Sequence, residues 1–233
     1  MKVLLGIPCP AFLRSKWLKR IFGFDGWLAE SKNEVRVAFE TTPNRMDRSI
    51  SGIIQAWKDS QAPWGVRLDA DILPETPFDE MLEYARQNWV RHHAITTSPT
   101  IDQHGVAQFL PVVPFSAGES CSGLPFEVEW ISGSINFVPR EVYDAFESIG
   151  HYTYMAVDPM NGRIKDARME YYIDVQRYNT TEDVDFCYKV KEHGFKVFAD
   201  PRLLCGQRRD DLSIPSFRKG FHFGENINVD MTP

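Results

Sequence analysis

Apolar positions follow two different periods over the first hundred residues. Residues 3–7 and 34–39 have the continuous or alternating apolar pattern of strands, and a third short strand is predicted at 64–68. Between these strands, apolar residues recur at helical spacing over 11–24 and 46–57. The alternation predicts an α/β fold with a mixed, mostly parallel sheet and helices on both faces.

Residues that favour helix ends mark two further helices. Thr76 and Pro77 are suited to the N-cap and the first helical position. Thr181 is suited to capping a helix over 182–193, and Gly194 is suited to ending it.

The second half of the chain has shorter predicted elements. They are strands at 94–98, 106–113, 126–131, 134–138 and 195–199, a helix at 139–146, and a hairpin insertion within 150–180. No repeat, low-complexity tract or linker interrupts the chain, so we expect one domain over 1–210 and a tail over 211–233.

Composition limits the classes of function. The 233 residues are 43% hydrophobic, as in globular proteins, and 26 Lys and Arg against 32 Asp and Glu give a net charge of −6. An acidic chain argues against nucleic acid as a partner. The 4 cysteines lack metal-ligand spacing and no apolar run is long enough to span a membrane, so a cytoplasmic protein is expected.

The predicted helix over 11–24 is basic as well as amphipathic. Its cations are Arg14, Lys16, Lys19 and Arg20. Two interpretations stay open: a helix packed on the sheet with solvated cations, which we favour, and a helix that makes a peripheral contact with a membrane surface.

Two acids follow the predicted strand at 64–68. Asp69 and Asp71 lie where open α/β sheets bind ligands, and they point the same way if the chain is extended there. Two carboxylates this close repel unless a cation lies nearby, and Mn²⁺ and Mg²⁺ prefer oxygen ligands. The alternative is a solvated loop, because Asp-x-Asp alone is a common pattern.

Two further segments are candidates for chemistry. Glu182 and Asp183 lie in the first turn of a predicted helix, where acids either stabilise the helix dipole or serve as a general base. Gly133 and Ser134 lie between two strands, where glycine permits close approach to a ligand or simply a tight bend.

In their order and separation these segments resemble the GT-A glycosyltransferases, particularly the family 2-like group. Three segments match: the pair Asp69 and Asp71, a stretch that begins at 132–133 and ends at 140–142, and a stretch that begins at 182–185 and ends at 194–197. The likeness covers about residues 2–206. It implies a GT-A fold with a nucleotide-binding half over 1–100 and an acceptor and catalytic half over 101–210.

The resemblance also implies roles for individual residues. Asp69 and Asp71 would hold Mn²⁺ or Mg²⁺ together with the donor diphosphate. Asp183 would be the catalytic base, with Glu182 beside it. Further donor-binding positions would be Pro8, Glu40, Arg45, Arg48, Gly133 and Ser134, and the two arginines are suited to a phosphate.

The sequence departs from the family pattern at two places. The Asp-rich turn expected after the second strand is replaced by residues 40–43, and the His expected after the last strand by residues 204–206. His222 is then the candidate third metal ligand, although a His between aromatic residues is more often packed in the interior. The tail over 211–233 would cover the active site.

These observations favour a metal-dependent glycosyltransferase that moves a sugar from a nucleotide-diphosphate donor to an acceptor hydroxyl. Inversion with Asp183 as general base is expected, and the acceptor (a glycan, lipid or protein) stays open. Two alternatives remain: a retaining transferase of the same fold and a non-catalytic carbohydrate-binding module. The Gly-rich start of a nucleotidyltransferase is absent.

Overall fold

The computed structural model describes residues 1–9, 15–41, 46–100, 108–113, 123–146, 153–157, 164–169, 181–209 and 212–213. Its main sheet has eight strands in the spatial order β2-β1-β3-β8-β5-β11-β7-β6. Their bounds are β1 Lys2–Cys9, β2 Glu34–Thr41, β3 Trp64–Leu68, β5 Ala94–Thr97, β6 Phe109–Pro111, β7 Phe126–Ile131, β8 Ile135–Pro139 and β11 Lys196–Ala199.

Six of these eight strands run in one direction. β1 is parallel to β2 and β3, and β11 is parallel to β5. β8 runs the opposite way between β3 and β5, and β7 does so between β11 and β6. The mixed, mostly parallel sheet expected from the sequence is present. Because β8 is antiparallel, the residues that precede it lie at the edge where β3 and β5 end.

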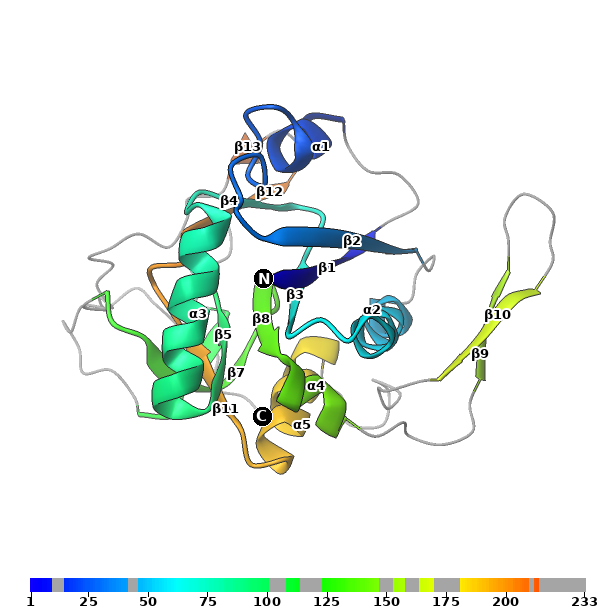
Figure 1. Cartoon of the computed structure of the whole chain (residues 1–233). Coiled ribbons are helices and arrows are strands. Elements are labelled where there is room, and N and C mark those ends of the chain that lie inside the picture. The colour runs from blue at the N-terminus through cyan, green and yellow to red at the C-terminus, as the bar shows by residue number, and fades with distance from the viewer. Residues whose placement is uncertain are drawn as a thin grey trace.

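Helices cover both faces of the sheet (Figure 1). They are α1 Ser15–Phe22, α2 Met46–Ser60, α3 Phe78–His92, α4 Arg140–Ala145 and α5 Glu182–Glu192. One hydrophobic cluster contains residues of α2, α4 and α5, and the other contains residues of α1 and α3. The alternation along β1 follows this division, since Leu4 belongs to the first cluster and Val3 and Leu5 to the second. Within the described ranges, every helix is too short or too polar to cross a bilayer.

Two small sheets lie outside the main one. β9 Thr153–Val157 and β10 Ile164–Met169 form an antiparallel hairpin, as predicted for this region. The second small sheet consists of β4 Ile72–Pro74, β12 Cys205–Arg209 and β13 Leu212–Ser213, and the sequence did not predict it. Its central pairing joins segments that are far apart in the sequence.

The start of α3 differs from the prediction by one residue. Pro77 is the N-cap, and it makes no side-chain capping bond. The Thr76 hydroxyl instead donates to the Arg202 carbonyl at 2.8 Å and accepts from the Leu204 amide at 3.0 Å. The hydroxyl that the sequence assigned to capping therefore ties the β4–α3 connection to the segment before β12.

Candidate functional site

Several predicted donor-binding residues lie at the edge where β1, β2 and β3 end. Pro8 and Glu40 are register partners on β1 and β2. The register between β1 and β3 pairs Gly6 with Arg67, so Pro8 and Asp69 each follow two residues after the last paired positions. The Asp69 amide donates to the Ser134 carbonyl at 3.0 Å, so the residues before β8 lie beside the end of β3.

The chain at Asp69 and Asp71 is not extended. The two side chains were expected to point the same way only if it were. The Asp69 carbonyl accepts from the Ile72 amide at 3.0 Å, which closes a turn over the acidic pair. The chain turns here because β4 begins at Ile72 and leaves β3 to pair with β12. Asp69 and Asp71 therefore lie at the same edge but not on one face of a strand.

Arg67, which belongs to none of the sequence motifs, connects the two acidic segments. Its side chain is 3% exposed, and Nη1 lies 2.6 Å from Oδ1 of Asp183 in the first turn of α5. Its Nε donates to Oδ1 of Asp69 at 3.0 Å, and Nη2 donates to Oδ2 of Asp69 at 3.2 Å. One guanidinium thus holds the carboxylate after β3 and the carboxylate at the start of α5.

Strand alternation explains why Arg67 can make these contacts. Its neighbours Val66 and Leu68 pack in the cluster under α1 and α3. Successive side chains on a strand point to opposite faces, so Arg67 points to the face covered by α2, α4 and α5. The site is therefore built from β3 and the N-terminus of α5.

Gly133 leaves space for this ion pair. A Cβ at this position would lie 2.5 Å from Asp183 Oδ1 and 2.8 Å from Arg67 Nη1. The close approach that the sequence predicted is thus made to side chains of the protein itself. Ser134 is buried, and its hydroxyl donates to the Ser98 carbonyl at 3.2 Å, so it links the start of β8 to the end of β5.

The site around Arg67 contains this one buried cation and several carboxylates. Burial raises the pKa of Asp69 above its usual range, the Arg67 guanidinium opposes this, and the carboxylates of Asp183 and Asp71 raise it further. Burial disfavours the charged form of Arg67, but attraction to Asp183 and Asp69 raises its pKa. An additional cation near Asp69 would relieve the repulsion among the acids.

The oxygen donors at this edge suit a hard divalent cation. Within the described part of the chain, no group of three or more His, Cys, Asp and Glu side chains is placed to hold a metal ion. Asp69 accepts from Arg67, yet an ionised carboxylate has about four lone-pair sites in total. Mg²⁺ is commonly bound by one or two carboxylates, substrate phosphates and water. Asp69 and Asp71 are oxygen donors of the type that such a cation takes.

For three of the predicted site residues, the side chain lies outside the described part of the structure. Arg45 and His222 lie outside the described residues, as does the tail beyond Ser213. Arg48 lies in α2, but its side chain is outside the description. The arginine contacts with a phosphate and the third metal ligand therefore stay predictions.

A second buried acid, Asp200, was also missed. It is fully buried after β11, where it accepts from Asn88 at 2.9 Å and from Arg202 Nη2 at 2.7 Å. The Arg202 guanidinium lies over the Tyr84 ring, 4.2 Å from its centroid. Because these contacts join α3 to the segment after β11, we assign Asp200 a structural role.

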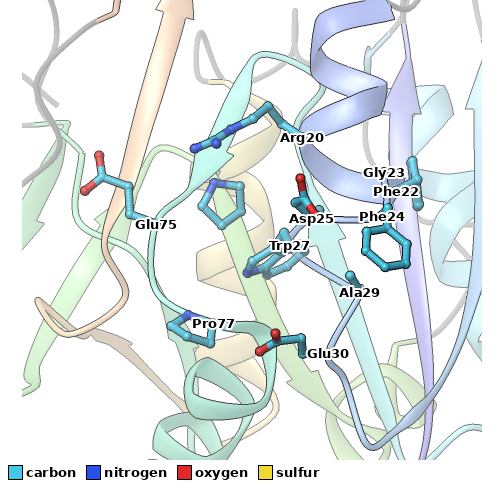
Figure 2. Close-up of a pocket in the computed structure, with 12 residues that line it drawn as sticks. Arg20, Phe22, Gly23, Phe24, Asp25, Trp27, Ala29, Glu30, Glu75 and Pro77 are labelled. Carbon is cyan, nitrogen blue, oxygen red and sulfur yellow. The ribbon is translucent and has the colours of Figure 1, made fainter.

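A separate hollow of about 740 Å³ lies between α1, the turn after it and the β4–α3 connection (Figure 2). Its lining includes Arg20, Phe24, Trp27 and Glu75. The Trp27 indole donates to the Thr76 carbonyl at 2.9 Å, which fixes this wall. The lining shares no residue with the predicted donor, metal or catalytic sets.

Comparison with known proteins establishes the fold and no family. No protein-family model matches the sequence, and no curated protein matches it. The crystal structure of A197 from STIV superimposes with a TM-score of 0.58 at 14% identity, over 98% of this chain and 97% of A197.

The chain shares the fold of A197. A UDP-glucose pyrophosphorylase from Acinetobacter baumanii matches more loosely, with a TM-score of 0.40 at 13% identity, over 79% of this chain and 60% of that protein. A superposition this loose establishes neither fold nor function.

Proposed function

We propose that this protein is a glycosyltransferase that uses a nucleotide-diphosphate sugar. The observation that carries the proposal is the contact of one buried guanidinium, Arg67, with both Asp69 and Asp183. The proposed reaction needs a site for the leaving diphosphate of the donor and, close to it, a base for the acceptor hydroxyl. Asp69 and Asp183 are separated by only one side chain, that of Arg67. They also lie at the edge where open α/β sheets bind ligands.

In this proposal Asp183 is the base. Arg67 donates to Oδ1 and thereby orients the carboxylate, so Oδ2 accepts the proton of an acceptor hydroxyl. The hydroxyl oxygen forms a bond to the anomeric carbon while the bond from that carbon to the diphosphate oxygen breaks on the opposite face. The anomeric configuration therefore inverts. Glu182 is the neighbouring acid, and its charge also acts on Arg67.

The donor lies along the ends of β1, β2 and β3 in the same proposal. Mn²⁺ or Mg²⁺ at Asp69 and Asp71 would supply positive charge to the departing diphosphate. Arg67 is poorly suited to that task because its positive charge is already balanced by the two carboxylates, to which three of its five N–H groups donate. Pro8 and Glu40, which are register partners, would border the nucleoside, and the backbone at Gly133 and Ser134 would border the sugar and acceptor.

The direct test is turnover of the Asp183→Asn variant. We expect a loss of roughly 10²–10⁴-fold, because an amide cannot accept the proton. Donor binding should persist, measured as a rise in Tm across UDP-, GDP-, dTDP- and CMP-sugars with and without Mn²⁺. Asp185→Asn is the matched control on the same helix, since Asp185 pairs with Lys189 at 2.8 Å. Wild-type turnover in Asp183→Asn would remove this residue from the role.

Two further readouts separate the alternatives. NMR analysis of the product anomer distinguishes an inverting from a retaining transferase. Sugar binding without turnover of any donor would indicate a non-catalytic carbohydrate-binding module. Chelation by EDTA is expected to abolish donor binding, and unchanged affinity would exclude the metal.

A further inference from the structure

The outer surface of α1 is basic. Lys16, Lys19 and Arg20 are exposed, and their spacing places them on one side of the helix. Trp17 and Ile21 on the opposite side are buried in the core cluster shared with α3. The apolar side of α1 is therefore occupied within the fold, and its cations point outward.

Exposed aromatic rings extend this surface. Phe24 is 98% exposed, Phe39 on β2 is 46% exposed and Phe22 is 38% exposed. The rings of Phe22 and Phe39 are in contact, with centroids 6.0 Å apart, so the end of α1 and β2 contribute to one apolar cluster. Exposed apolar area of this kind indicates a surface that a partner covers.

The charge of this region is opposite to that of the whole chain. The first acidic residue in the sequence is Asp25, which follows five Lys and Arg residues, although the net charge is −6. Within the described ranges, the three cations on α1 form no ion pair. The nearest acids in the sequence, Asp25 and Glu30, line the hollow that Arg20, Phe22 and Phe24 also line (Figure 2).

We propose that this surface, defined as Lys16, Lys19, Arg20, Phe22, Phe24 and Phe39, docks the protein on an anionic membrane. Its cations would be attracted to acidic headgroups, and its phenyl rings would enter the boundary between headgroups and acyl chains. The contact differs from that of a free amphipathic helix, because the fold buries the apolar side of α1. The proposal is independent of the sugar-transfer reaction.

The test is partitioning of the full chain onto vesicles of phosphatidylcholine alone or mixed with phosphatidylserine. We expect binding to the mixed vesicles, weakened by high salt. Lys19→Glu should lower the partition coefficient roughly 25-fold, since each cation near the surface contributes about fivefold and charge reversal counts twice. Arg91→Glu on α3 makes the same charge change at an exposed site and should have no effect.

A second pair of variants tests the contribution of the aromatic rings to vesicle binding. Phe24→Ser should weaken binding, whereas Val90→Ser, at a 77% exposed position on α3, should not. All four variants alter exposed side chains, so unchanged circular dichroism and Tm confirm that folding is intact. Equal partitioning of Lys19→Glu and Arg91→Glu, or no preference for the anionic vesicles, would overturn the proposal.

Discussion

The Arg67 side chain balances the charge of two partly buried carboxylates. Arg67→Met would leave Asp69 and Asp183 without their cation, and we expect the free energy of unfolding to fall by about 3–5 kcal/mol. Urea denaturation at pH 7 measures the loss. The control is Arg140→Met, because Arg140 pairs with Asp144 at the surface and should change stability little. Similar losses in both variants would show that Arg67 is not central to the site.

Gly133→Ala tests the space around the same ion pair. The added methyl would overlap Asp183 Oδ1 and Arg67 Nη1, so we expect a loss of about 1–3 kcal/mol and reduced turnover. Gly194→Ala is a useful contrast, because its Cβ meets no atom within 4 Å and only its φ of +83° is unfavourable. Loss of stability without loss of turnover is expected there. Normal turnover in Gly133→Ala would contradict the proposed site.

The sequence could identify the acids and Gly133 but not the residue that joins them. A charged residue within the otherwise apolar strand at 64–68 indicates that Arg67 has a buried partner. Which acid it contacts depends on how β3 and α5 are placed in three dimensions, and a single sequence does not contain that information.

At the scale of elements, Asp79 fixes the start of α3 to the loop before β2. It accepts from the Ser31 hydroxyl at 2.7 Å, the Lys32 amide at 2.8 Å and the Asn33 side chain at 2.8 Å. Partial burial tends to raise the pKa of Asp79, but these hydrogen bonds outweigh that effect and lower the pKa. A lowered pKa adds stability that is present above the unfolded-state pKa of about 3.9 and is lost as the pH falls through the folded value.

Asp79→Asn should therefore reduce the free energy of unfolding by about 1 kcal/mol at pH 7, and the difference should shrink in acid. Urea denaturation over a pH series measures the gap between the two proteins. Glu83→Gln, at an exposed position on the same helix, is the control. A gap that stays constant down to the most acidic pH would contradict the assigned pKa direction.

Local signals predicted both ends of α5. Thr181 caps α5 by accepting from the Val184 amide at 3.5 Å, and Gly194 follows its end with positive φ, both as expected. The assignment of Thr76 failed because its hydroxyl bonds to the segment before β12. β4 and β12 were missed because short strands of this kind exist only through their long-range pairing.

At the scale of the molecule, hydrophobic periodicity was sufficient to predict an α/β fold with helices on both faces. The strand order was not predictable in the same way. β8 lies between β3 and β5 although it follows both in the chain, and nothing in its own residues specifies those neighbours.

This strand insertion has a consequence for synthesis on the ribosome. Until residues 135–139 have emerged, β3 and β5 lack the partner that joins them, and their backbone edges stay open. We therefore expect a fragment of residues 1–100 to self-associate, as measured by light scattering against the full chain. A folded, monomeric fragment would contradict this. The nascent polypeptide would then need shielding from its neighbours until well over half of it has been translated.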